Sequence, residues 1–104
     1  MAERLIGMLI FPRLTQLDMT GPYEVLARLP NTKVHLVADT MAPVKTDRGM
    51  EIVPTITLND CPQLDLVMVP GGPGQQDLME DAVVRRVVAE RVGKTLGTNK
   101  TLGV

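Results

Sequence analysis

The chain has 104 residues, which is enough for one small domain and too few for two. Apolar residues make up 44% of it, so it can bury a core, and a net charge of −1 gives no general reason to expect nucleic acid or an acidic membrane as a partner. Its single cysteine cannot form an internal disulfide, and no apolar stretch approaches the ~20 residues that span a bilayer. We therefore expect a soluble, cytoplasmic domain that binds neither nucleic acid nor membrane.

The first part of the sequence predicts a strand followed by a helix. Leu5–Phe11 is a nearly continuous apolar run, typical of a central parallel strand covered on both faces, and the start of the chain resembles this strand more than a signal peptide. Thr20 is a candidate helix N-cap with Pro22 in the first turn, and the helix then extends to about Leu29. The preceding stretch Leu14–Asp18 is expected to form a separate helical turn.

The next segment predicts a second strand and a hairpin. Lys33–Asp39 has the composition of a short strand, and Pro43–Leu58 resembles two strands joined by a turn at Asp47–Gly49. Pro54 in the second of these strands favours a sheet edge, because proline cannot donate a hydrogen bond to a neighbouring strand.

Beyond the hairpin, Leu64–Val69 predicts a third buried strand and Asp77–Val92 an amphipathic helix. Strands that alternate with helices indicate a parallel sheet with crossover connections. We therefore predict an α/β fold, namely a flavodoxin-like parallel sheet with flanking helices and a β-hairpin.

The charge of the chain changes after residue 82. Residues 1–82 contain six Lys or Arg and eleven Asp or Glu, whereas residues 83–104 contain five and one. We interpret residues 83–104 as a basic helix, with valines on one side and arginines in water, followed by a frayed tail. The alternative is a patch for nucleic acid or membrane, but this segment has no aromatic residue to stack on bases or anchor at an interface.

A glycine-rich turn, Pro70–Gly74, follows the third predicted strand. A dinucleotide fingerprint would need a third glycine where Asp77 stands, and a phosphate-binding loop ending at Gly93–Thr95 would need one in place of Val88. What remains is a turn at the carboxyl end of a parallel strand, which is where open α/β sheets bind ligands. Its amides could hold an oxyanion or a carboxylate, or the glycines could serve only a tight turn.

The segments IGMLIFPRLTQLDMTGPYEVLARLP, DCPQLDLVMVPGG and LMED resemble the N-terminal half of the ThiJ/PfpI superfamily, over about Ile6–Ala82. Within it, the bacterial isonitrile hydratases are most similar. The resemblance implies a cofactor-free carbon–nitrogen hydro-lyase, in which a cysteine attacks the carbon of a small-molecule isonitrile and water then releases an N-substituted formamide. It also implies that Asp18 is catalytic, facing that cysteine and moving protons, and that Gly72, with Gly71 beside it, offers an amide to an oxyanion.

The sequence departs from the family where the nucleophile is expected. The Cys-Thr-Gly-type elbow of the family has no counterpart, since the corresponding region reads GTNKTLGV. Cys61 is expected to be a small buried residue instead, because it precedes the third strand and so lies at the end opposite the glycine turn. We therefore expect a truncated or altered form of the family domain that is inactive alone; the alternative is a non-catalytic remnant or a small-ligand-binding module.

The other polar candidates are expected to have structural roles. His35 should face the surface of a strand, and Glu24 should be a solvated carboxylate on the helix. We expect no metal site, since Cys, His and carboxylates do not cluster at metal-ligand spacing, and the seven methionines should mostly fill the core.

We also expect self-association. Strands that are apolar on both faces need cover on both, and two predicted helices leave part of the sheet open. A homodimer, formed by edge pairing or domain swapping, would cover it.

Overall fold

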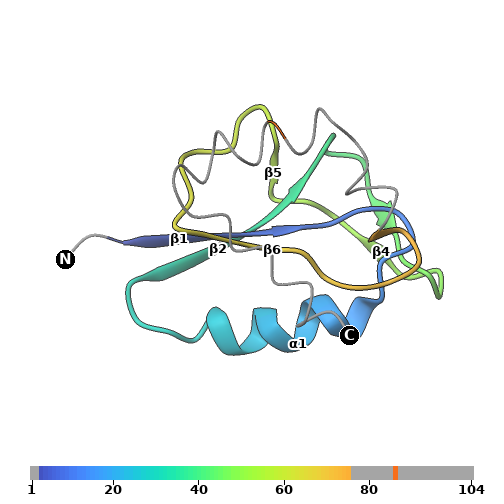
Figure 1. The fold of residues 1–104 in the computed structure, drawn as a ribbon, viewed down its shortest axis with the longest axis horizontal. Helices are drawn as coiled ribbons and strands as arrows, with labels where there is room; N and C mark the ends of the chain where they lie inside the picture. Colours follow the sequence, from blue (N-terminus) through green and yellow to red (C-terminus); the bar gives the residue numbers. More distant parts are fainter. Residues whose placement is uncertain (1–2, 76–85, 87–104) are drawn as a thin grey trace.

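The computed structural model describes residues 3–75 and residue 86, and its centre is a parallel sheet (Figure 1). Among the described residues the sheet has four strands in the order β5-β2-β1-β6, and every neighbouring pair is parallel. The predicted α/β class with a parallel sheet is therefore confirmed. The strands are β1 (Arg4–Leu9), β2 (Thr32–Ala38), β5 (Ile56–Thr57) and β6 (Leu66–Met68).

The pairing of β1 with β6 joins distant parts of the chain. Met8 of β1 lies in register with Leu36 of β2 and Met68 of β6, so β1 is central as predicted. At the start of this pairing Leu5 and Asp65 exchange two hydrogen bonds. The amide of Asp65 donates to the carbonyl of Leu5, and the amide of Leu5 donates to the Asp65 carboxylate, each at 2.8 Å.

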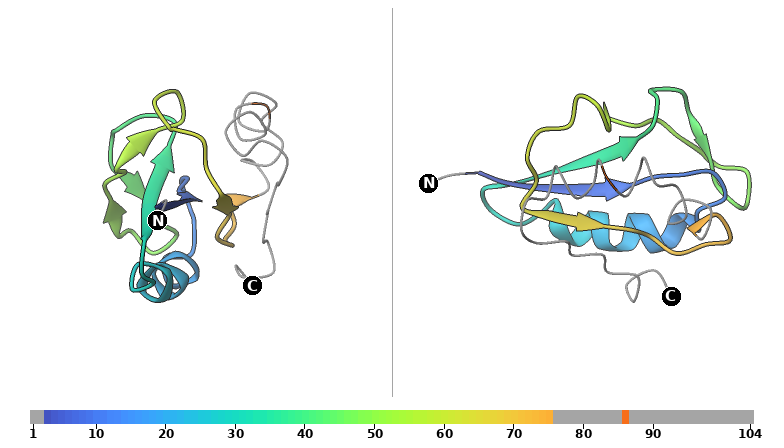
Figure 2. Two further views of the ribbon diagram at one scale, coloured as in Figure 1. Left: turned by 90° about the vertical axis from the view of Figure 1, so that its left-hand side faces the viewer. Right: turned by 45° about the horizontal axis from the view of Figure 1, so that its top comes forward.

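One helix, α1 (Gln16–Leu26), lies along one face of the sheet (Figures 1 and 2). The predicted N-cap at Thr20 is wrong, because the helix begins four residues earlier and Thr15 is its N-cap. Thr20 lies inside the helix, where its hydroxyl donates to the carbonyl of Gln16, a bond that a helical serine or threonine can make to the preceding turn. Pro22 is also inside the helix, so the predicted separate turn and the helix are one element.

The predicted hairpin is present, but its second arm is shorter than expected. Strands β3 (Val44–Lys45) and β4 (Glu51–Ile52) pair antiparallel, and the amide of Thr46 donates to the carbonyl of Met50 across the turn. The prediction that Pro54 lies within this arm is wrong, since β4 ends before it. The chain instead leaves the hairpin and joins the main sheet as the edge strand β5.

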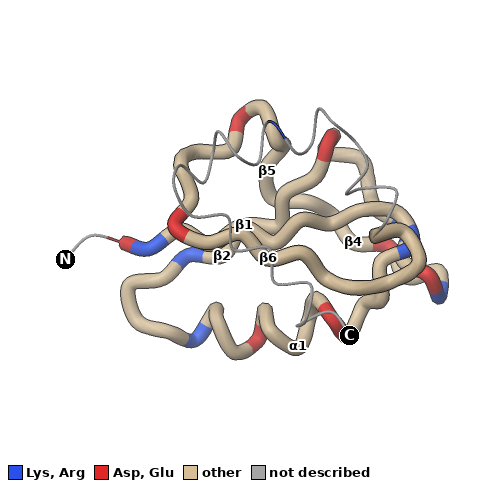
Figure 3. Tube along the Cα trace, viewed as in Figure 1, with Lys and Arg blue, Asp and Glu red and all other residues tan. Residues whose placement is uncertain are grey.

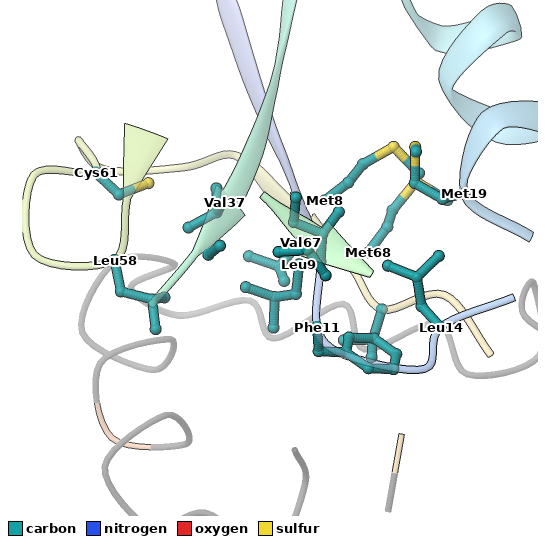
Figure 4. Packing of buried hydrophobic residues seen from close by; sticks show 14 of the residues in the cluster. Met8, Leu9, Phe11, Leu14, Met19, Val37, Leu58, Cys61, Val67 and Met68 are labelled. Carbon is teal, nitrogen blue, oxygen red and sulfur yellow. The ribbon is translucent and has the colours of Figure 1, made fainter. Parts of the chain in front are cut away.

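The core lies on both faces of the sheet (Figure 4). Between the sheet and α1, Met8, Met19 and Met68 gather around Leu14, so these methionines fill the core as predicted. Met41 and Met50 are exposed. The remaining buried apolar side chains include Leu9, Phe11, Val37, Leu58, Cys61 and Val67.

Charged residues lie at strand ends, along α1 and in the loops, and the middle of the sheet is free of them (Figure 3). Of the predicted basic helix Asp77–Val92, only Arg86 is described, and it is helical and exposed; the rest, like the predicted frayed tail, lies outside the described residues. Within the described part of the chain, no helix has the length and apolar character needed to cross a membrane.

Candidate functional site

The glycine turn packs directly on the loop that connects β1 to α1, here called the β1–α1 loop (residues 11–15). The amide of Thr15 donates to the carbonyl of Gly71 at 3.0 Å, and the amide of Gly74 donates to the carbonyl of Arg13 at 3.3 Å. Both segments follow the carboxyl ends of neighbouring parallel strands, so they meet at the same edge of the sheet (Figure 1). This is the edge at which open α/β sheets bind their ligands.

Two glycines make this contact possible. Gly72 has a φ of +129°, and a Cβ on it would lie 2.5 Å from the amide nitrogen of Thr15 and 2.8 Å from the carbonyl oxygen of Arg13. A Cβ on Gly74 would overlap the carbonyl oxygen of Pro12. The turn and the loop therefore approach backbone to backbone, and this packing alone requires glycine at both positions.

The two amides that the sequence predicts to bind an oxyanion belong to a buried residue, Gly71, and a half-buried one, Gly72. Among the hydrogen bonds of the described residues, neither the amide of Gly71 nor that of Gly72 donates to an acceptor. The carbonyls are used, since that of Gly71 accepts from Thr15 and that of Gly72 from Gln75. A turn whose carbonyls accept bonds, and whose amides at Gly71 and Gly72 find no acceptor among the described residues, favours an anion over a cation.

Asp18 lies in the first turn of α1, and two hydrogen bonds through Thr15 connect it to the glycine turn. Its amide donates to the carbonyl of Thr15 at 3.0 Å, while the amide of Thr15 donates to Gly71. One residue thus links the predicted acid to the predicted oxyanion turn. Asp18 is half-buried and is not the N-cap, although a carboxylate in the first turn also interacts favourably with the helix dipole.

A hollow in the described part of the molecule lies beside these residues rather than at them. It is a cavity of about 560 Å³ at the carboxyl ends of β1 and β2. Its lining includes Arg13 and Gly74 but not Asp18, Gly71 or Gly72. Most of the lining is apolar: Leu9, Ile10, Phe11, Val37, Ala38, Val44 and Leu58.

Cys61 is buried, as predicted, with 4% of its surface exposed. Its Sγ lies 3.4 Å from the carbonyl oxygen of Pro62. A thiol in this environment has little of the exposure that marks a reactive cysteine. Its predicted distance from the glycine turn stays a prediction.

The other polar candidates have structural surroundings. Glu24 is exposed, as predicted, and pairs with Arg28 at 2.7 Å. His35 is half-buried rather than surface-facing, with its Nδ1 3.3 Å from the hydroxyl of Thr55; burial, and then the positive charge of Lys33, lower the pKa of its imidazole. Among the described residues, no three Cys, His or carboxylate side chains lie together as metal ligands.

Sequence reasoning missed two residues that adjoin this site. The hydroxyl of Thr15 donates to Oδ2 of Asp47, at the tip of the hairpin, at 3.0 Å. The only local signal is Thr15 itself, which is a good N-cap residue. Nothing local indicated Asp47 beyond its place in a turn.

The sequence profile described as DJ-1/PfpI family matches residues 4–97. The isonitrile hydratase of Pseudomonas putida is 54% identical over 76 residues, which cover 73% of this chain and 33% of that protein. The chain thus spans about a third of the length of this curated relative.

Solved structures give the same fold. The crystal structure of a ThiJ/PfpI family protein from Pseudomonas syringae has a TM-score of 0.81 at 35% identity, and the match covers 88% of this chain and 38% of that one. Drosophila melanogaster DJ-1beta has a TM-score of 0.73 at 22% identity, covering 85% and 49%. The second match supports the fold alone.

Proposed function

Because the chain belongs to the DJ-1/PfpI family, we propose that it supplies the proton-transfer and oxyanion-binding part of an isonitrile hydratase site. The observation that supports this most is the bonding of Thr15, which joins the first turn of α1 to a glycine turn whose amides at Gly71 and Gly72 find no acceptor among the described residues. In this proposal Asp18 is the proton carrier, and Gly72, with Gly71 beside it, binds the oxyanion. The substrate is a small isonitrile, and no cofactor or metal takes part.

The overall reaction adds water across the isonitrile, so that R–N≡C and H₂O become R–NH–CHO. A thiolate from a nucleophilic cysteine would attack the terminal carbon, and a proton would be delivered to that carbon. Water would then attack the same carbon, one of its protons would pass to the nitrogen, and the sulfur would leave as the thiolate while the second proton is released to form the formamide carbonyl. Asp18 would move the protons in these steps, while the amides of the glycine turn would bind the oxygen as it becomes negatively charged.

We propose further that the 104-residue chain does not catalyse this reaction alone, as a truncated form of the domain. Its single cysteine, Cys61, is buried, and a general acid with an oxyanion site retains only part of the rate without a nucleophile. The test is to incubate the purified chain with an alkyl isonitrile and measure formamide by chromatography, with no product expected above the buffer blank. Formamide production that is lost in Asp18→Asn but kept in Cys61→Ser would overturn this proposal.

The role of Asp18 can be tested in a completed protein, in which a C-terminal part carrying the cysteine elbow is joined after Ala82. Asp18→Asn should lower kcat at least about a hundredfold, because the amide cannot carry protons, and should change the free energy of unfolding by less than ~1 kcal/mol. Glu24→Gln is the matched control, since Glu24 is an exposed carboxylate on the same helix. Full activity of Asp18→Asn per folded molecule would contradict the catalytic role.

A small-ligand-binding module is the second candidate function, and the apolar cavity at the ends of β1 and β2 favours it. In that case N-alkyl formamides or isonitriles should shift the NMR signals of residues around this cavity without turnover. Ala38→Leu, which enlarges a buried lining residue, should weaken the shifts. Shifts confined to Asp18 and the glycine turn would argue for the first function instead.

We also propose that the chain works in the cytoplasm, where its single thiol would stay reduced, and that it self-associates. The large exposed apolar side chains among the described residues lie on α1, just after it and around the hairpin, namely Leu17, Val25, Leu29, Met41, Met50 and Val53. Sedimentation at tens of micromolar should show a dimer or larger species. A compact monomer that binds no hydrophobic dye would contradict self-association, and cell fractionation tests the location.

A further inference from the structure

The β1–α1 loop lies between two other segments of backbone and bonds to both. On one side, the amide of Arg13 donates to the carbonyl of Lys45, and the amide of Asp47 donates to the carbonyl of Leu14, both at 2.9 Å. On the other side lies the glycine turn. Hairpin, loop and turn are therefore three adjacent layers at the carboxyl edge of the sheet (Figure 2, left).

A side-chain bond adds to these backbone bonds between hairpin and loop, and it involves the N-cap of α1. An N-cap threonine ordinarily accepts a hydrogen bond from an amide of the first turn, which stabilises a helix by about 1 kcal/mol. Thr15 makes no such bond; its hydroxyl donates to Oδ2 of Asp47 at 3.0 Å. The N-terminus of α1 thus lacks its usual side-chain cap, and the hydroxyl ties it to the hairpin instead.

Thr15 is consequently bonded in three directions. Its amide donates to Gly71, its carbonyl accepts from Asp18, and its hydroxyl donates to Asp47. A shift of the hairpin would therefore move Thr15, and a shift of Thr15 would change the separation of the Asp18 carboxylate from the turn amides. Catalytic groups need to be held to within about 0.5 Å by such supporting bonds.

We propose that Thr15 and Asp47 form a positioning pair that sets the placement of Asp18 relative to the amides of Gly71 and Gly72. The proposal rests on the proposed function, which gives these groups their chemistry. Neither residue of the pair touches the reacting atoms; both act through the groups that they hold. The hairpin is thereby part of the site's support, although it is separate from the main sheet.

The test measures amide hydrogen exchange by NMR in the full 104-residue chain. Thr15→Val keeps the β-branched shape and removes the hydroxyl, and it should accelerate exchange of the Asp18, Asp47 and Gly74 amides about tenfold. Thr15→Ser should restore the wild-type rates. The matched control is Thr57→Val, which removes the same kind of bond, from Thr57 Oγ1 to Asp60 Oδ2 at 3.2 Å, outside this site; it should leave the three rates unchanged.

Three results would overturn the proposal. The first is unchanged exchange of these amides in Thr15→Val. The second is equal acceleration of the sheet amides of Ile10 and Leu58, which would indicate a general loss of stability. The third is failure of Thr15→Ser to restore the rates. If Thr15→Val does not fold, Asp47→Ala removes the acceptor at an exposed position and carries the same expectations.

Because exchange needs no turnover, this result is independent of isonitrile hydration. A positive exchange result with no hydration in the completed protein would leave the positioning pair standing and reject the proposed function.

Discussion

The glycine turn and the edge strand β5 are both held to the centre of the sheet, but by different means. The turn is held by close contact between backbones, with Gly72 and Gly74 pressed against the β1–α1 loop. Strand β5 has only two residues in register with β2. Just before it, the hydroxyl of Thr55 accepts from the amide of Leu36 at 2.9 Å and lies 3.3 Å from the carbonyl of the same residue.

This difference predicts different responses to mutation. Backbone contact leaves no room for any side chain, so the glycine turn should tolerate no substitution at these glycines. Removing a side-chain hydrogen bond costs only the free energy of that bond, so a substitution at Thr55 should destabilise the edge strand without rearranging it. The predictions below test this contrast.

The largest effect is expected for Gly72→Ala. The added Cβ meets backbone atoms of Thr15 and Arg13, and the φ of +129° is strained for alanine, so the free energy of unfolding should fall by about 3 kcal/mol or more. Urea unfolding measures it. Gly21→Ala is the control, because a Cβ there meets nothing within 4 Å and alanine favours a helix by ~1 kcal/mol. Equal losses in the free energy of unfolding for Gly72→Ala and Gly21→Ala would contradict the special intolerance of the glycine turn.

A smaller effect is expected for Thr55→Val, which removes the hydroxyl but keeps the β-branched shape. Loss of the two hydroxyl bonds to Leu36, with the bond from the Thr55 amide to the Leu36 carbonyl kept, should lower the free energy of unfolding by about 1–2 kcal/mol and accelerate exchange of the Leu36 amide. Thr40→Val is the matched control, since it loses one exposed bond from the amide of Ala42 at 3.3 Å and should change stability by less than ~0.5 kcal/mol. A loss as large as that of Gly72→Ala would show that the edge strand is not the more tolerant region.

The smallest effect concerns pH and His35, whose imidazole adjoins Thr55. Burial, and then Lys33, lower its pKa below the ordinary 6.5, with Glu3 opposing. The unfolded chain therefore binds the proton more readily, so stability is complete above pH 6.5 and falls as the pH drops through the lowered pKa of the folded state. Thermal melts between pH 7.5 and about pH 5 should show this slope in the wild type and a shallower one in His35→Gln. Identical slopes would exclude His35 as the cause.

Three strands of the parallel sheet, β1, β2 and β6, could be predicted from the sequence because their composition and apolar pattern are local signals. The start of α1 could not, because Thr15 and Thr20 are both good N-cap residues and the local pattern does not choose between them. The length of the second hairpin arm could not be predicted either, because Ile56 pairs with Val37 of β2 rather than with the hairpin.

For the candidate site, Asp18 and the glycines of the turn came from the family resemblance and from the turn's place after a strand. The hydrogen bonds through Thr15 that connect Asp18 to Gly71 are a property of the structure. The bond of Thr15 to Asp47 spans 32 positions of the sequence, and no local pattern specifies a partner at that distance.

The pair of hydrogen bonds between Leu5 and Asp65 bears on the order in which the protein folds. It closes a loop of 60 residues, whereas β1 and β2 are joined by a single helix, and longer loops lose more chain entropy on closure. We expect β1, α1 and β2 to assemble first and β6 to dock afterwards, bringing the glycine turn with it. Pulse-labelled exchange should then protect the β2 amides before those of Asp65 and Gly74, and simultaneous protection would contradict this order. The ligand-binding edge would be the last part of the domain to exist during folding and the first to be lost when β6 detaches.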